Sequence, residues 1–423
     1  MAVTDIANSN LTFTGVPLGV EVTKVTDSSA DWASVPNSTY FYDKADKLIH
    51  FKNSGGTVLE IFSAAGGLTQ FTEAANSSAP NATVPVNSLT ATGADTNIDV
   101  AIVPKGTGAI LAAIPDNTTA GGNKRGANAI DLSTATRSNA DRVASGASSV
   151  ILGQNCRAYN TGAVAIGSGV FSGGLQSVGL STGFASGDYS FSIGSSSTAS
   201  GRASVAFGGT QYGAVTASGE ASLALGNSTA SGLFSIAMGE SNTASAQGAS
   251  AVGGRNNLAN AYLSSVSGGY CTANSVEGRQ VRGRALGLVQ GETQKSEFFL
   301  SIRTTSNTAT TVTVAGGAAG TSNQVILSNN SAFRFKGTII GKQSGSTNVA
   351  AWDVDGIIVR GANAAATTLS LGNVTLVQNT PAWGTPTLAA DTTNGGLRVQ
   401  VTGATATNIQ WTAVIETTEV IYA

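Results

Sequence analysis

Few side chains in this chain could carry out hydrolysis. Glycoside hydrolysis needs two carboxylates across a cleft, and the candidates are Asp353 with Asp355, which share one face of a strand-like segment, and Glu416 with Glu419, which share a face only after a shift of frame. A Ser-His-Asp site would have to use His50, the sole histidine, which lies far in sequence from any plausible nucleophile. Carboxylate pairs on one strand are usually solvated, so we predict no catalytic residue and no enzyme activity.

Metal and phosphate chemistry have equally little support. Cys156 and Cys271 are the only cysteines and are far apart, so we expect two reduced, buried fillers rather than metal ligands or a disulfide. The segment Pro104–Gly108 contains a Gly-x-Gly, but it lacks the spacing and the following helix of a phosphate loop. We therefore expect neither a metal nor a cofactor.

A short phrase repeats about every 14 residues between Gly146 and Gly269, and this repeat determines the fold expected for that stretch. Its best copies read SGASSVILG, SGDYSFSIG, SGRASVAFG, SGEASLALG and SGLFSIAMG. Each copy closes on a glycine, at Gly153, Gly167, Gly194, Gly208, Gly226, Gly239, Gly254 and Gly268. A period this short cannot be a folded domain, and it predicts one coil of a β-solenoid built by stacking.

Within each coil two apolar residues flank a small one, as in Val164-Ala165-Ile166. This period of two predicts a short strand with one buried face, and we expect the apolar pair to form the core. Such strands must pair with those of the next coil, about 4.8 Å away. One apolar face per coil makes a thin core, which favours association of three chains.

Residues 143–285 resemble the head repeats of trimeric autotransporter adhesins of the YadA type, whose phrase is S-x-A-x-G followed by A-x-G. The resemblance implies a left-handed parallel β-roll in a homotrimer, with apolar residues facing the trimer axis and the roll interior. The chain departs from the pattern at Ser181, which replaces a closing glycine, and near Gly209–Gly213, where one coil is longer. In the last copies the apolar residue is shifted by one, at Val252 and Val266.

Upstream of the repeats, GADTNIDVAIVPKGTGAIL (93–111) resembles the short shaft units of bacteriophage tail fibres. From its own residues this segment predicts a hairpin, with an alternating strand at Ile98–Ile102 and a return at Ala109–Leu111. Residues 122–146 resemble the entry segment before such rolls, and we expect Arg125, Arg137 and Arg142 to cap the first coil and tie chains together.

The regions on either side of the repeats predict further β structure. We expect an N-terminal β attachment domain (1–80), a linker and short shaft (81–142), the β-roll (143–288) and a C-terminal jelly-roll-like β-sandwich (289–423). Phrases such as AFRFKGTIIGKQ resemble the distal domain of some phage tail-fibre proteins. Trp352 and Trp411 are expected to fill that domain's core, whereas Trp383, in a Pro-flanked loop, is the candidate receptor contact.

Together these resemblances imply a homotrimeric tail fibre on the virion of a tailed phage. Its expected partners are a baseplate, tail or capsid protein at the N-terminal domain and a host-surface glycan or protein at the C-terminal domain. A net charge of −2 gives no reason to expect nucleic-acid binding, and no apolar run suggests membrane insertion. The alternatives are a capsid-attached head fibre or decoration protein, a depolymerase with its carboxylates between subunits, and a bacterial trimeric surface adhesin, which is disfavoured by the lack of a visible signal or anchor.

Overall fold

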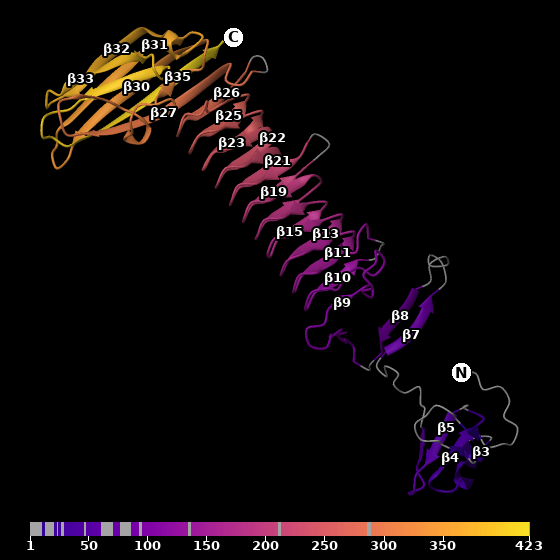
Figure 1. The fold of residues 1–423 in the computed structure, drawn as a ribbon. Coiled ribbons are helices and arrows are strands. Elements are labelled where there is room, and N and C mark those ends of the chain that lie inside the picture. The colour runs from indigo at the N-terminus through magenta and orange to yellow at the C-terminus, as the bar shows by residue number, and fades with distance from the viewer. Residues whose placement is uncertain are drawn as a thin grey trace. The chain divides into compact units, whose positions relative to one another are not determined.

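The computed structural model describes residues 11–12, 21–22, 24–26, 29–45, 48–60, 71–76, 86–92, 95–133, 137–209, 213–285 and 289–422. It divides into two units, Met1–Val103 and Pro104–Ala423. The described residues form strands and short 3-10 helices (Figure 1). None of the helices among them is long and apolar enough to cross a membrane.

The first unit contains a small sheet of strands β3 (Lys24–Thr26), β4 (Thr39–Asp43), β5 (Leu48–Lys52) and β6 (Val58–Glu60), and a separate hairpin of β7 (Phe71–Asn76) and β8 (Val86–Ala91). β4 and β5 pair antiparallel, with Tyr40 opposite Phe51. His50 is fully buried between the rings of Trp32 and Phe41, at centroid distances of 4.6 and 5.3 Å. It is therefore a core residue of this domain.

The second unit begins with a parallel β-solenoid of about nine turns, which confirms the predicted fold class at that level (Figure 1). Its main ladder stacks β9 (Ile110–Leu111), β10 (Ile130–Ser133), β11 (Val150–Gln154), β13 (Val164–Ser168), β15 (Val178–Ser181), β17 (Phe191–Ile193), β19 (Val205–Gly208), β21 (Leu223–Ala230), β22 (Ile236–Ala244), β23 (Ser250–Arg255), β25 (Ser265–Gly269) and β26 (Gln280–Arg284). A second ladder stacks the shorter strands β12 (Arg157–Ala158), β14 (Phe171–Ser172), β16 (Phe184–Ala185), β18 (Ser197–Ala199), β20 (Val215–Ala217) and β24 (Leu258–Ala259), joined by the ends of β21 and β22.

The small residue of each phrase, and not the apolar pair, fills the solenoid interior. In the main ladder the inner column includes Ile151, Ala165, Ala206, Ala224, Ala237 and Ala251, all fully buried. In the middle coils the flanking apolar residues point outward, so our expectation that they form the core of the chain was wrong. Alternation shows which residues share a face but not which face is inside, and the narrow coil admits mostly small side chains there.

Two features close the coils. In most copies the buried serine of the phrase donates its hydroxyl to the backbone carbonyl three residues earlier, as Ser204 does to Gly201 at 2.7 Å. The closing glycine has a positive φ, +132° at Gly167, where a Cβ would lie 2.3 Å from the carbonyl oxygen of Ser181 in the next coil. The other predicted closing glycines share the positive φ: Gly153, Gly194, Gly208, Gly226, Gly239, Gly254 and Gly268.

The predicted shaft hairpin is wrong. Residues 98–104 form no strand, and Ile102 is 74% exposed. Ile110–Leu111 instead pairs in parallel with Ile130–Asp131, which makes β9 the first rung of the ladder. The solenoid therefore starts upstream of residue 143, because any extended segment aligned with the end of a stack can satisfy its backbone groups by adding a rung.

At the other end, β27 (Thr293–Thr304) pairs antiparallel with β26 and carries the solenoid ladder into a second β region. Its main sheet has the order β27-β35-β30-β31-β32, with β30 (Ser331–Gln343), β31 (Val349–Arg360), β32 (Thr367–Asn379) and β35 (Ile409–Ile421). A smaller sheet joins β28 (Ala309–Thr311), β29 (Val325–Ile326), β33 (Gly384–Asp391) and β34 (Gly396–Thr402). The inner faces of the two sheets share one aromatic core.

Candidate functional site

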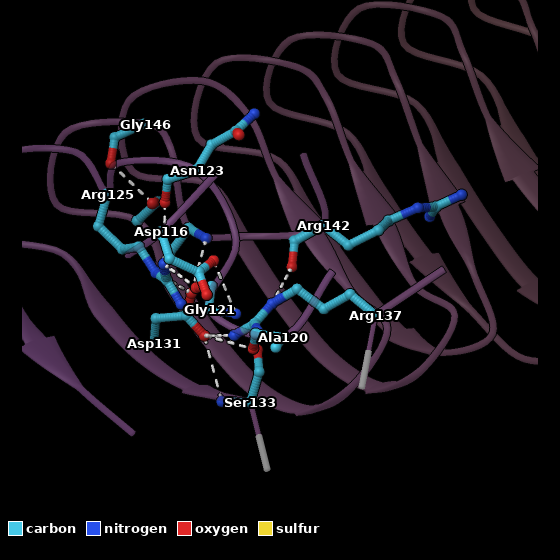
Figure 2. Close-up of polar contacts among 12 residues, drawn as sticks. Asp116, Ala120, Gly121, Asn123, Arg125, Asp131, Ser133, Arg137, Arg142 and Gly146 are labelled. Atoms are coloured by element: carbon cyan, nitrogen blue, oxygen red, sulfur yellow. Dashed lines mark hydrogen bonds and ion pairs between the residues drawn. The ribbon is translucent and has the colours of Figure 1, made fainter. Parts of the chain in front are cut away.

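A buried charge cluster closes the N-terminal end of the solenoid (Figure 2). Asp131 stands in the inner column, where the next coil carries Ile151, and its carboxylate accepts from Arg125 Nε at 2.6 Å, with both side chains almost fully buried. Arg137 lies 4.0 Å from the same carboxylate and donates to the carbonyls of Ala120 and Arg142. Arg125 and Arg137 therefore cap the first coil, whereas Figure 2 shows the guanidinium of Arg142 pointing away.

The electrostatics of this cap favour the ionised acid. Burial alone would raise the pKa of Asp131, but the Ser133 hydroxyl and the Arg125 guanidinium together hold the pKa below its ordinary value. These contacts join the segment before the first coil to the inner column of the solenoid. The expectation that these arginines also tie chains together stays a prediction.

Both cysteines lie inside the solenoid and are free, as predicted. Cys156 and Cys271 are fully buried at equivalent positions of the second ladder, near its two ends. Burial raises the pKa of the Cys156 thiol and raises that of Cys271 to about 11. Neither thiol is poised for chemistry, because the thiolate is the reactive form.

Trp383, the candidate receptor contact, is not exposed as we expected. The side chain is only 6% exposed and packs edge-on against Trp411 at 5.4 Å in the aromatic core. Its loop is the start of β33, an edge strand that the sequence did not reveal because Pro386 interrupts it at a register shift. Trp352 and Trp411 are core residues as predicted.

The most prominent exposed feature of the solenoid is a pair of apolar columns on the outside of the main ladder. Column one has the first apolar residue of each phrase: Val150, Val164, Val178, Phe191, Val205, Leu223 and Ile236. Column two has the second: Leu152, Ile166, Leu180, Ile193, Phe207, Leu225, Met238 and Val252. Phe207 is 51% exposed and Leu152 39% exposed. A contiguous apolar strip of this length is typical of an interaction surface.

The carboxylates named from the sequence do not all come together. Asp353, Asp355 and Glu416 lie on the outer face of the main C-terminal sheet, where they line a shallow groove of about 380 Å³ with Lys336. Glu419 lies on the inner face, 1% exposed, because β35 runs without a bulge and an odd separation puts the two glutamates on opposite faces. The predicted frame shift is therefore wrong.

Two of the three outer-face carboxylates, Glu416 and Asp355, form ion pairs within the chain. Glu416 accepts from Lys295 at 2.8 Å and lies 3.5 Å from Lys336, and hydrogen bonding from Lys295 holds the pKa of Glu416 below its ordinary value. Asp355 pairs with Arg334 at 2.9 Å. These contacts favour the ionised form of Glu416, whereas a general acid requires a raised pKa.

Glu419 instead holds the solenoid to the C-terminal sheets. Arg279, on the last coil, donates to Glu419 at 2.5 Å and to the Ser296 hydroxyl, and its guanidinium lies 5.1 Å from the ring centre of Phe298. Gln294 also donates to Glu419 at 2.8 Å. Within the described part of the chain, no three metal-ligating side chains come close enough to hold an ion.

Comparisons with known proteins give little beyond the fold. No protein-family model matches the chain, and no curated protein does. Among solved structures, the chain is similar to the tailspike protein gp49 of Acinetobacter baumannii bacteriophage Fri1, a capsular polysaccharide depolymerase, with 10% identity and a TM-score of 0.20. The match covers 69% of this chain and 44% of the tailspike, so the chain spans less than half the length of that protein.

This comparison corrects one expectation. We predicted that the chain is not an enzyme, and a similar solved structure is described as a depolymerase. The exclusion of enzyme activity is therefore withdrawn. The description concerns that tailspike, and it assigns neither a reaction nor a catalytic residue to this chain.

Proposed function

We propose that this chain is a structural fibre protein of a tailed-phage virion, assembled as a homotrimer and used to attach to the bacterial surface. The observation that carries the proposal is the pair of outward apolar columns. Water-exposed apolar surface along most of the solenoid is unfavourable, and three copies packed about an axis parallel to the rod would cover it. The YadA-like repeat phrase supports the same arrangement, a left-handed roll in a trimer.

The phage assignment rests on sequence resemblance. The phrase at 93–111 and the entry segment at 122–146 resemble tail-fibre shafts, and the solenoid that follows them has the extended form of a spacer. In this proposal the N-terminal β domain docks on the tail or baseplate. The C-terminal jelly-roll-like region contacts a host-surface glycan or protein. A capsid-attached fibre has the same parts and differs only in what the N-terminal domain binds.

Sedimentation of the intact protein tests the assembly. We expect a trimer, and a matched pair of variants should locate its interface. Phe207→Asp introduces three charges into the apolar columns and should dissociate the trimer or raise its dissociation constant. Phe234→Asp alters a phenylalanine that is 59% exposed at a solenoid turn, outside both columns, and should leave the trimer intact.

Two outcomes contradict the proposal. A stable wild-type monomer would show that the columns have another occupant, and dissociation by both variants alike would show that the columns are not the interface. Labelling the N-terminal domain on intact particles then distinguishes tail from capsid attachment. Label at neither place would exclude a virion fibre.

A further inference from the structure

We infer that the outer face of the C-terminal sheet continues the subunit interface, so that the three C-terminal domains contact one another rather than splaying apart. The occupant of this face is a second copy of this chain. The inference rests on the proposed homotrimer and goes beyond it, because the resemblance to adhesin heads covers only the solenoid.

The strand register carries the argument. Column one runs from Ile236 through Ser250, Ser265 and Gln280, and then by direct pairing into the C-terminal sheet at Glu297, Glu416, Lys336 and Asp355. Column two runs from Val252 through Ser267 and Arg282 to Lys295, Thr418, Arg334 and Ile357. The ladder has no break at the domain boundary. The outer face of the solenoid, which packs against the other copies in the proposed trimer, is therefore continuous with the outer face of the C-terminal sheet.

The chemistry of the columns changes within the last solenoid coils. The columns are aliphatic and aromatic up to Ile236 and Val252 and polar from Ser250 and Ser267 onward. On the C-terminal sheet they carry both signs of charge, with exposed apolar residues beside them. These apolar residues are Phe299 (46%), Ile340 (45%) and Ile357 (38%). A mixed surface of this kind can pair with a copy of itself by charge complementarity and also bury apolar area.

Lys295, Lys336 and Glu416 on this surface pair with one another. Several other charges on it have no ion-pair partner within the part of the chain that the structure describes, among them Arg282 in column two and Glu297 in column one. Arg282 and Glu297 line a groove of about 220 Å³ across β25, β26 and β27. The groove leaves room for a side chain from outside.

The position of these two charges fits a cyclic trimer. A three-fold interface is heterologous, so that one edge of each chain packs against the other edge of the next. Column two of one chain then lies beside column one of its neighbour, and Arg282 and Glu297 are one rung apart. We assign them as an interchain ion pair that fixes the register of the three C-terminal domains.

Site-directed cross-linking tests the inference on the full chain. Thr418→Cys places a thiol in column two on exposed β35, and Thr387→Cys places one on exposed β33 of the smaller sheet. The native cysteines are fully buried and do not compete. With a short bis-maleimide we expect Thr418→Cys to give covalently joined chains and Thr387→Cys to remain monomeric on a denaturing gel.

Sedimentation of the same samples separates the possible failures. A trimer whose Thr418→Cys chains do not cross-link overturns this inference and leaves the proposed fibre intact. A monomer overturns the proposed function itself. Equal cross-linking of both variants would indicate random collisions and also overturn the inference.

Charge reversal tests the assigned ion pair. In the Thr418→Cys background, Arg282→Glu or Glu297→Arg alone should lower the cross-linking yield severalfold, and the double reversal should restore it. Because the two residues are also diagonal neighbours within one chain, the two single variants are then co-expressed with different tags. Preferential cross-linking between the two tagged chains supports an interchain pair, and a random mixture overturns it.

Discussion

The solenoid and the C-terminal β region bury opposite kinds of side chain. The inner columns of the solenoid are largely alanine, serine and small aliphatic residues, and its large apolar residues lie mainly outside. The C-terminal region encloses Trp352, Trp411, Phe298, Phe333 and Phe335 between its two sheets. The same chain therefore contains one region that completes its own core and one that presents its apolar surface to the outside.

This difference determines where the stability of each region arises. Buried aromatic side chains contribute several kcal/mol each, whereas an alanine column contributes little. The solenoid must rely on its hydrogen-bonded ladders, on the exact fit of its turns and, in the proposed trimer, on covering its columns. We therefore expect the stability of the solenoid to depend mainly on backbone geometry at its turns. The stability of the C-terminal region should depend mainly on filling its core without cavities.

The largest effect should come from a side chain on a closing glycine. Gly167→Val combines a φ of +132° with a Cβ that would lie 2.3 Å from the Ser181 carbonyl oxygen, and we expect it to cost more than about 5 kcal/mol. Far-UV circular dichroism should show loss of solenoid structure. The solenoid contains no tryptophan. Tryptophan fluorescence should therefore show that the C-terminal region is still folded.

Gly169→Ala is the control for that variant. Gly169 also has a positive φ, +71°, but a Cβ there meets nothing within 4 Å. It should cost about 1 kcal/mol from backbone strain alone. Similar losses for the two variants would mean that contact between coils does not limit the solenoid.

The second prediction removes an aromatic from the C-terminal core. Trp411 is fully buried, contacts Trp383 and Trp352, and donates its indole N–H to Thr304 at 2.9 Å. Trp411→Ala should cost about 4 kcal/mol in chemical denaturation followed by fluorescence. Leu376→Ala, on a side chain 59% exposed, should change stability by less than about 0.5 kcal/mol. An equal effect of the two would contradict the assigned core.

The same difference explains what could be predicted from the sequence. The 14-residue phrase was sufficient for the solenoid, because a parallel stack needs only local repetition. Long alternating segments such as 332–342 and 350–360 also appeared as strands. Which face of each strand is buried was not predictable, because the alternation of Val164 and Ala165 is the same whichever of the two residues lies inside.

The candidate surface was harder to foresee because it depends on register. Lys336 and Asp355 lie on the consecutive strands β30 and β31, but Glu416 joins them only because the distant strand β35 pairs with β30. Trp383 was misassigned because Pro-flanked loops are usually exposed, and here the loop leads into an edge strand over the core. Both the neighbours of Glu416 and the burial of Trp383 depend on which strands pair in the folded chain, and residue spacing in the sequence does not show that pairing.

The third prediction concerns the buried cap of the solenoid. Asp131→Asn leaves the buried Arg125 without a counter-charge and should cost about 3 kcal/mol. Asp141→Asn breaks a partly exposed pair with Arg157 (3.0 Å) and should cost less than about 1 kcal/mol. Thermal unfolding of the two variants gives the comparison, and equal losses would contradict a special role for the cap.

The same carboxylate predicts an acid dependence. The pKa of Asp131 in the folded chain is lower than its ordinary value of 3.8, so its stabilising contribution is complete above about pH 4 and is lost as the pH falls through the lower folded value. Asp131→Asn removes that dependence. The variant and the wild type should therefore approach each other in stability at low pH, and a constant difference down to pH 2 would contradict the assignment.

The smallest effect should come from repairing the one closing position that lacks glycine. Ser181 has a φ of +66° in the rung where the phrase otherwise has glycine. Ser181→Gly relieves the strain of a side chain in the left-handed region but adds entropy to the unfolded chain, so the net gain should be about 0.5 kcal/mol. Ser200→Gly, at an exposed serine outside the positive-φ positions, should lose a similar amount. Opposite signs for these two serines in thermal unfolding would show that backbone geometry limits the solenoid, and a loss in both would show that it does not.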